Sequence, residues 1–223
     1  MESVIGRREN TEVLEELKEQ TLNYSRKMLH RGLTRGTGGN ISVRDEKTGL
    51  IVITGSGIDY DEMTLDDIVV VDPEGRTIEG RVKPSSELPM HLACYKARPD
   101  AMAAVHTHST FATVMSCMQK KLRTVHYLIG FAGGEVECIP FCPIGSEELA
   151  QTTARALEKR NAVLLGNHGL MAVGPGLKFA FSVAEETEFV AELCYRTELA
   201  GGAEILGRED IAPIVSFAEK YLK

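Results

Sequence analysis

Two histidines in the stretch from residue 103 to residue 110 have the spacing of paired metal ligands. The run of small and β-branched residues predicts a buried strand, on which His106 and His108 point to the same side and Thr107 to the other. Two neutral imidazoles held in this way can share a metal ion at roughly 2.0–2.1 Å from each nitrogen. The alternative is a pair of hydrogen-bonded core histidines, because a catalytic metal site needs a third ligand from elsewhere.

The third ligand is expected at His168. This histidine follows a short apolar strand and lies in the run Gly166-Asn167-His168-Gly169, where the glycines allow a close approach of backbone and leave the ring unshielded. Three histidines with an open fourth position are typical of a catalytic zinc site rather than a structural one.

Glu87 is the candidate acid or base. It follows Ser85 and Ser86 at the predicted start of a helix, so we expect it in the first turn, where the helix dipole favours a charged carboxylate. The alternative is a carboxylate that serves only the electrostatics of the helix end. His91 lies one helical turn further on the same face and is expected to orient the site, not to bind the metal.

Loops that combine hydroxyl groups with glycine suggest a phosphate site. Residues 34–40 and 54–57 each adjoin a predicted strand, and their glycines let backbone N–H groups converge on an anion. The loop 34–40 taken alone is best explained as a turn, but the two loops and the serines before Glu87 could together place phosphate, carboxylate and metal within the length of one small substrate. In the first loop the Thr37 hydroxyl and the Asn40 amide are added donors, and Ser85 and Ser86 could also hold a phosphate.

The composition excludes several other classes of function. A net charge of −7 over 223 residues argues against a broad surface for nucleic acid or anionic membrane. The sequence has no apolar run of membrane length and no cleavable signal, so we expect a cytoplasmic protein. The five cysteines are scattered and odd in number, which predicts reduced thiols, and Cys138 and Cys142 lack the second pair of a structural zinc site.

Strands and helices alternate along the chain without an internal repeat or a linker, which favours one α/β domain over residues 1–223. The segment 124–129 is expected to be a strand on which His126 and Tyr127 face opposite sides, and Glu185, Glu186 and Glu188 are expected to be solvated. Predicted helices cover residues 11–31, 86–97, 109–118, 146–159, 177–199 and 210–222; predicted strands cover 41–44, 50–53, 68–71, 77–78, 103–108, 124–129, 136–139, 162–165 and 170–173.

With these motifs the sequence resembles the class II aldolase and ribulose-phosphate epimerase family, and most of all its L-fuculose-1-phosphate aldolase branch. The resemblance extends from the first helix to about Leu199. It is carried by Gly36-Thr37-Gly38-Gly39-Asn40, Thr54-Gly55-Ser56-Gly57, Pro84-Ser85-Ser86-Glu87, His106-Thr107-His108, His126-Tyr127 and Asn167-His168-Gly169.

The resemblance implies a three-layer α/β/α fold with a mainly antiparallel central sheet, and a homotetramer with active sites between subunits. It also implies that His106, His108 and His168 bind one Zn²⁺ per subunit, and that Glu87 is the acid/base and a fourth ligand when substrate is absent. Tyr127 would reach the site from the adjacent subunit, and the phosphate would be held by Thr37, Asn40, Ser56, Gly57, Ser85 and Ser86.

The reaction implied is cleavage of the C3–C4 bond of a ketose 1-phosphate to dihydroxyacetone phosphate and an aldehyde, with L-fuculose 1-phosphate, rhamnulose 1-phosphate and 5-deoxyribulose 1-phosphate as candidate substrates. Zinc would stabilise the carbanion, Tyr127 would take the proton of the C4 hydroxyl, and Glu87 would deliver one to C3.

Three alternatives share the fold. A ribulose-5-phosphate 4-epimerase commonly has aspartate after the two serines, so Glu87 favours the aldolase. A methylthioribulose-1-phosphate dehydratase has the same metal and phosphate motifs, and spacing does not separate it from the aldolase. A binding module like the adducin head lacks the metal histidines, which this sequence keeps.

Overall fold

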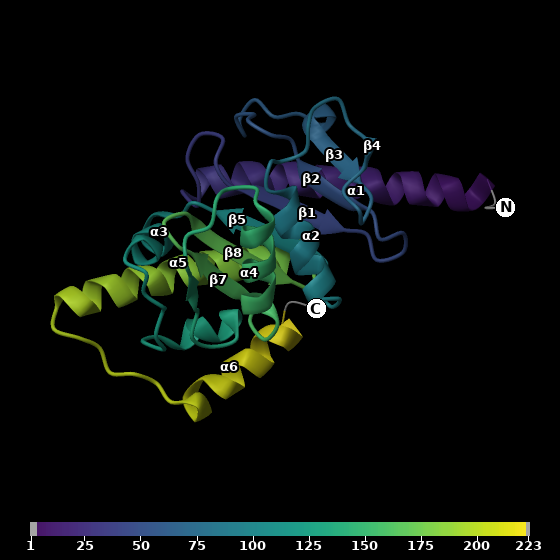
Figure 1. Cartoon of the computed structure of the whole chain (residues 1–223). Helices are drawn as coiled ribbons and strands as arrows, with labels where there is room; N and C mark the ends of the chain where they lie inside the picture. Colours follow the sequence, from purple (N-terminus) through teal and green to yellow (C-terminus); the bar gives the residue numbers. More distant parts are fainter. Residues whose placement is uncertain (1–3, 222–223) are drawn as a thin grey trace.

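A computed structural model describes residues 4–221, and its centre is a single sheet of eight strands (Figure 1). The strand order is β4-β3-β2-β1-β5-β8-β7-β6, and every neighbouring pair is antiparallel except β6 and β7. The strands are β1 (Asn40–Arg44), β2 (Ile51–Thr54), β3 (Ile68–Val71), β4 (Thr77–Glu79), β5 (Ala103–Thr107), β6 (Cys138–Ile139), β7 (Ala162–Leu165) and β8 (Gly169–Gly174).

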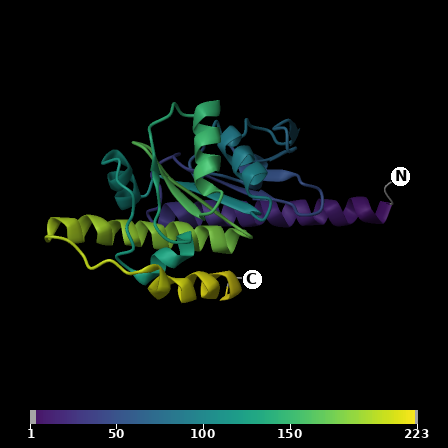
Figure 2. The same cartoon turned by 60° about the horizontal axis from the view of Figure 1, so that its bottom comes forward.

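Helices cover both faces of the sheet. In Figure 2 the long helices α1 (purple) and α5 (yellow-green) run along one side, whereas α4 (green) stands on the other. The helices are α1 (Val4–His30), α2 (Leu88–Ala97), α3 (Thr110–Cys117), α4 (Glu147–Leu157), α5 (Leu177–Leu199) and α6 (Arg208–Tyr221), with short 3-10 helices η1 (Leu65–Asp67) and η2 (Tyr127–Ala132).

The alternation of side chains along the strands builds two apolar cores. On β5, Ala103 and Val105 pack with α1, α3 and α5, whereas Ala104 packs with α2 and α4 on the opposite face. Because every residue of the central strands is buried on one face or the other, the sheet is a middle layer between helices. The expected three-layer α/β/α arrangement with a mainly antiparallel sheet is therefore confirmed.

The antiparallel register brings several chain ends to one edge of the sheet. Asn40, the first residue of β1, is the partner of His106 near the end of β5, and Thr107 is the partner of Leu170 at the start of β8. At the end of β2, the Thr54 carbonyl accepts a hydrogen bond from the Ser85 N–H at 3.0 Å. The loops with the candidate site residues therefore meet at this edge, although they are far apart in sequence.

Two local predictions were wrong. Residues 127–132 form η2, not a strand, because they close local hydrogen bonds such as Ile129 N–H to His126 O and end at Gly133 with φ +87°. Helix α6 packs on this segment, and its Ile214 lies against Gly130. Glu188 is half-buried rather than solvated, since its carboxylate accepts the backbone N–H groups of Phe111 and Ala112 at the start of α3.

Other differences are smaller. The first helix extends back to Val4, seven residues before its predicted start, and the last runs over Arg208–Tyr221, while Leu222 of the prediction lies outside the described residues. The five cysteines are unpaired, as expected. Within residues 4–221, none of the helices combines the length and the apolar character that crossing a membrane requires.

Candidate active site

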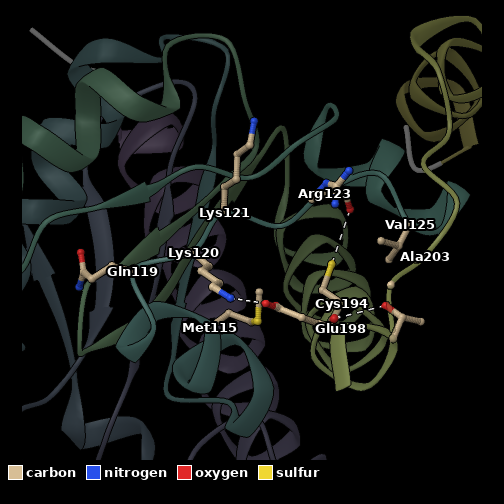
Figure 3. A pocket seen from close by; sticks show the side chains of 11 residues that line it. Met115, Gln119, Lys120, Lys121, Arg123, Val125, Cys194, Glu198 and Ala203 are labelled. Carbon is tan, nitrogen blue, oxygen red and sulfur yellow. Dashed lines mark hydrogen bonds and ion pairs between the residues drawn. The ribbon is translucent and has the colours of Figure 1, made fainter. Parts of the chain in front are cut away.

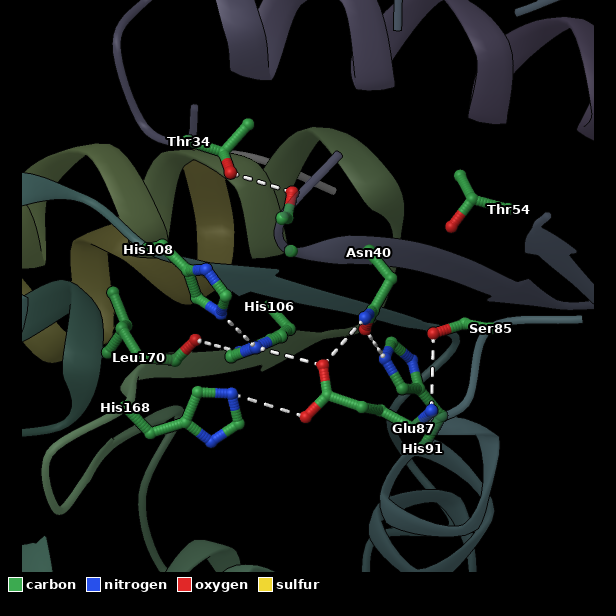
Figure 4. Close-up of polar contacts among 12 residues, drawn as sticks. Thr34, Asn40, Thr54, Ser85, Glu87, His91, His106, His108, His168 and Leu170 are labelled. Carbon is green, nitrogen blue, oxygen red and sulfur yellow. Dashed lines mark hydrogen bonds and ion pairs between the residues drawn. The ribbon is translucent and has the colours of Figure 1, made fainter. Parts of the chain in front are cut away.

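Four side chains from three segments converge at this edge of the sheet (Figure 4). One ligand atom each of Glu87, His106, His108 and His168 lies within 4.8 Å of all the others. The ring centroid of His106 lies 4.8 Å from that of His108 and 4.7 Å from that of His168. The three histidines and the carboxylate singled out by sequence thus form one cluster.

Hydrogen bonding to the backbone directs the ring of His106 into the cluster. This side chain is fully buried, and its Nδ1 lies 2.9 Å from the carbonyl oxygen of Leu170 on β8. Because a carbonyl only accepts, Nδ1 carries the hydrogen, and Nε2 is the nitrogen that faces Glu87 Oε2 at 3.1 Å and His108 Nε2 at 3.0 Å.

Glycines let the neighbouring loops reach the histidines. A Cβ on Gly38 would lie 2.6 Å from His108 Nδ1, and one on Gly39 would lie 2.6 Å from the carbonyl oxygen of His106. A Cβ on Gly169 would lie 2.2 Å from the carbonyl oxygen of Thr107. These glycines therefore allow close packing around the paired histidines, which the sequence predicted for Gly169 but not for Gly38 and Gly39.

Glu87 lies at the N-cap of α2, one position before the expected first turn, and its two oxygens differ. Oε2 accepts a hydrogen bond from Asn40 Nδ2 at 2.9 Å and faces His106. Oε1 is buried, lies 3.3 Å from His168 Nε2 and has no hydrogen-bond partner among the described residues. Ser85 Oγ accepts the Glu87 N–H at 3.2 Å, which fixes the backbone of this turn.

Electrostatic coupling sets the protonation of the cluster. Burial opposes the charge of Glu87, but His106, His168 and the Asn40 amide together hold the pKa of this carboxyl below its usual range. Burial also opposes a charged His106, yet the adjacent Glu87 raises the pKa of that imidazole. Burial and the neighbouring histidines lower the pKa of His108 to about 4, and burial and His106 lower the pKa of His168 to about 4. Two neutral imidazoles therefore face a carboxylate near pH 7.

This donor set fits a divalent cation. The imidazole nitrogens and carboxylate oxygens of the cluster offer more lone pairs than there are hydrogens to share among them. Glu87 Oε1 is a buried acceptor with no hydrogen-bond donor among the described residues. A divalent cation held by these residues would give the buried carboxylate a positive partner in place of the proton that His106 shares with it. Three imidazoles and one exchangeable carboxylate are the ligand types of a catalytic zinc centre.

Comparison with known proteins agrees with this site. The model of the class II aldolase and adducin N-terminal domain family matches residues 19–195. The chain belongs to this family. It is 42% identical to the 5-deoxy-D-ribulose 1-phosphate aldolase of Bacillus thuringiensis serovar kurstaki over 94% of this chain and 98% of that protein. It is 38% identical to the L-fuculose phosphate aldolase of Escherichia coli K12 over 92% of this chain and 95% of that protein.

The solved structures agree. An L-fuculose 1-phosphate aldolase superposes with a TM-score of 0.87 at 39% identity, over 91% of this chain and 95% of that one. The protein is thus a class II aldolase, an enzyme of the lyase class, and class II aldolases depend on a metal.

The candidate phosphate residues of this class II aldolase fall into two groups. Asn40 and Ser85 are buried and already bonded to Glu87. The side chains of Thr37, Ser56 and Ser86 are exposed, and within the described residues their hydroxyls have no hydrogen-bond partner. The bridge between Gly55 and Pro84 holds two of the three loops together, and Gly57, with φ +74°, faces open space.

Among the described residues, Tyr127 makes no hydrogen bond or ring contact with the cluster of its own chain. It belongs to η2, its side chain is 48% exposed, and its ring lies 4.5 Å from that of His126. The His126 ring in turn meets Phe189 of α5, so the two neighbours expected on opposite faces of a strand share one aromatic surface. The structure therefore does not bring Tyr127 together with Glu87 within one chain.

A separate cavity of about 470 Å³ lies beside the far end of α5 (Figure 3). Its lining includes Lys120, Lys121 and Arg123 but no residue of the cluster. Lys120 is paired with Glu198 across the cavity, and Lys121 with Glu135. None of the residues assigned to the metal, the phosphate or proton transfer lines this cavity.

Sequence reasoning missed the residues behind the cluster. Ser42 and Tyr95 belong to a buried hydrogen-bond chain that ends at Glu87, and Gln119 donates to the Asn167 side chain beside His168 at 2.9 Å. Gln119 and Asn167 both adopt positive φ, near +53° and +54°. Ser42 and Tyr95 could have been found as polar residues on the buried faces of a predicted strand and a predicted helix. No local sequence pattern indicates a role for Gln119.

Proposed function

We propose that this protein is a zinc-dependent aldolase that reversibly cleaves a deoxyketose 1-phosphate, such as 5-deoxyribulose 1-phosphate or L-fuculose 1-phosphate, to dihydroxyacetone phosphate and an aldehyde. The observation that carries the proposal is the unpaired, buried Glu87 Oε1 beside three converging imidazoles. The names of the relatives at 42% and 38% identity support the substrate class.

His106, His108 and His168 would hold the zinc ion, with Glu87 as a fourth ligand until substrate arrives. Zinc would supply a positive charge that stabilises the negative charge left on the donor half when the C3–C4 bond breaks. Glu87 would exchange the proton with C3 through Oε1 during the reaction, because Oε2 accepts the Asn40 amide. No lysine is required for this chemistry.

The phosphate group is assigned to the loop edge around the cluster. The free hydroxyls of Thr37, Ser56 and Ser86 and the open backbone at Gly57 support this placement. Asn40 and Ser85 both bond to Glu87, and we assign the remaining N–H group of the Asn40 amide and the Ser85 hydroxyl to the phosphate as well.

Tyr127 would act from an adjacent subunit of a homotetramer, where it takes the proton of the C4 hydroxyl as the bond breaks. The exposure of its ring on η2, away from the cluster of its own chain, supports a role between subunits. A single domain over residues 1–223 and a cytoplasmic location complete the proposal.

The test is a coupled assay for dihydroxyacetone phosphate released from 5-deoxyribulose 1-phosphate and from L-fuculose 1-phosphate. Native, chelator-treated and zinc-restored protein are compared at equal concentration. We expect release that disappears with chelator and returns with zinc, and the ratio of the two rates ranks the aldehyde halves. Absence of release from both sugars while zinc remains bound stoichiometrically would contradict the proposal and direct the search to the dehydratase.

A further inference from the structure

A continuous chain of buried hydrogen bonds runs from α2 through β1 to Glu87. Tyr95 Oη lies 2.7 Å from Ser42 Oγ, which lies 2.6 Å from His91 Nδ1. On the other side of that ring, His91 Nε2 lies 2.6 Å from Asn40 Oδ1, and Asn40 Nδ2 donates to Glu87 Oε2 at 2.9 Å. All five side chains are more than nine-tenths buried, and His91 is fully buried. Figure 4 shows His91 and Asn40 behind Glu87, on the side away from the three clustered rings.

The direction of every bond in this chain follows from its end at the carboxylate. Glu87 as a carboxylate can only accept, so the Asn40 atom that faces it must be the NH₂ group, and the Asn40 oxygen must face His91. That oxygen needs a donor, so the hydrogen of His91 is on Nε2. Nδ1 then accepts from the Ser42 hydroxyl, which in turn accepts from Tyr95.

We propose that His91 is a positioning residue of the aldolase, which fixes the Asn40 amide so that it binds Glu87 Oε2 and leaves Oε1 as the oxygen that exchanges a proton with substrate. This proposal rests on the function proposed above. The Glu87 carboxylate selects the orientation of the Asn40 amide, the amide oxygen selects the Nε2–H tautomer of His91, and the Ser42 hydroxyl supplies the donor that Nδ1 needs in that tautomer. His91 in turn holds the Asn40 amide in place. Burial and the neighbouring His106 lower the pKa of His91 to about 3, which agrees with a neutral ring that has one N–H.

Loss of the Ser42 hydroxyl is the informative change. Without the Ser42 hydroxyl, Nδ1 of His91 is a buried acceptor that has lost its donor, so the Nε2–H tautomer is destabilised. In the other tautomer Nε2 becomes an acceptor, the Asn40 amide turns over, and its oxygen then faces the Glu87 carboxylate. Tyr95→Phe removes only the outer donor and leaves the Ser42 hydroxyl bonded to His91, so its effect should be smaller.

The experiment compares Ser42→Ala and Tyr95→Phe with the matched control Ser25→Ala in the zinc-loaded protein. Ser25 is also fully buried, and among the described residues its hydroxyl donates only to the Thr21 carbonyl within α1, not to a residue of the site. One readout is exchange of the C3 proton of dihydroxyacetone phosphate with D₂O, in which Glu87 takes the proton as the C–H bond breaks and returns a deuteron to the same carbon. The second readout is the histidine tautomer from ¹⁵N chemical shifts, which needs no activity.

We expect Ser42→Ala to lower kcat for exchange by about 10–100-fold with little change in KM, the usual effect of losing a partner behind a ligand. Tyr95→Phe should lower it less, and Ser25→Ala should match the native protein. The ¹⁵N shifts should show the Nε2–H tautomer for His91 in the native protein and lose it in Ser42→Ala.

A native protein with the Nδ1–H tautomer at His91, or a Ser42→Ala variant that exchanges as fast as Ser25→Ala, would overturn the proposal. Absence of exchange in the native protein with zinc bound would instead count against the aldolase function, and the tautomer would still decide the role of His91.

Discussion

Gly38→Ala should weaken zinc binding while leaving the fold intact. The added Cβ would lie 2.6 Å from His108 Nδ1 and 3.2 Å from His108 Cε1. Since non-bonded heavy atoms prefer about 3.5 Å, the ring must move by roughly 0.9 Å. A catalytic constellation tolerates displacements of only about 0.5 Å, so His108 would leave the position in which its nitrogen meets that of His106.

The same geometry gives the size of the effect and its control. The neighbour of Gly38 is the end of a side chain, so we expect zinc affinity to fall by about 10–100-fold and the free energy of unfolding of the metal-free protein to change by less than about 1 kcal/mol. Gly169→Ala meets a backbone atom, the Thr107 carbonyl oxygen at 2.2 Å, and should instead destabilise the metal-free fold by about 1–3 kcal/mol. Gly176→Ala meets nothing within 4 Å and serves as the control.

Zinc affinity is measured by competition with a chromophoric chelator, and stability by urea unfolding after metal removal. The reasoning is refuted if Gly38→Ala binds zinc as tightly as Gly176→Ala. It is equally refuted if Gly38→Ala loses as much metal-free stability as Gly169→Ala, because the clash would then not be confined to His108.

Three further predictions concern the cluster and its supports. Glu87→Gln should lower exchange of the dihydroxyacetone phosphate proton by about 10²–10⁴-fold, with retained binding of that ligand measured by calorimetry. In metal-free protein, the free energy of unfolding should fall as the pH drops below about 6.5. The reason is that a histidine in the unfolded chain binds a proton near that pH, whereas in the folded protein His91 binds one only near its pKa of about 3 and His108 near its pKa of about 4. Urea titrations at several pH values should give a slope that approaches about 1.4 kcal/mol per pH unit for each histidine. Asn167→Ala should destabilise the protein by about 1–2 kcal/mol more than Asn167→Gly, because φ is +54° at this residue, and a thermal shift that is equal for both would contradict that strain.

The sequence predicted most elements well where burial alone decides them. The strands at residues 68–71 and 162–165 and the helix at 177–199 have the expected bounds, because runs of apolar residues must lie between layers whatever their partners are. The convergence of His106 and His108 was also predictable, since spacing along a strand fixes the side on which two residues lie.

The failures come from partners that local patterns do not identify. The position of Glu188 on its helix predicts a solvated residue. In the fold, the start of α3 lies against it with two N–H groups that have no partner within that helix, and these donate to its carboxylate. Residues 127–132 have the composition of a strand but no neighbouring strand to pair with, and α6 packs on them instead. In both cases the competing interaction joins segments more than 70 residues apart.

Asn40 shows most clearly what a sequence does contain. It was assigned to the phosphate through its glycine-rich loop, and the structure shows in addition that its amide lies between His91 and Glu87. Yet Asn40 and Ser42 are spaced by two on a buried strand, and Glu87, His91 and Tyr95 are spaced by four along one helix. Polar residues at strand spacing and at helix spacing, both inside an apolar core, must satisfy one another, because neither stripe has water to bond. A buried polar stripe on one element therefore predicts a matching stripe on another, and here that pairing would have located the support of Glu87 before any coordinates were known.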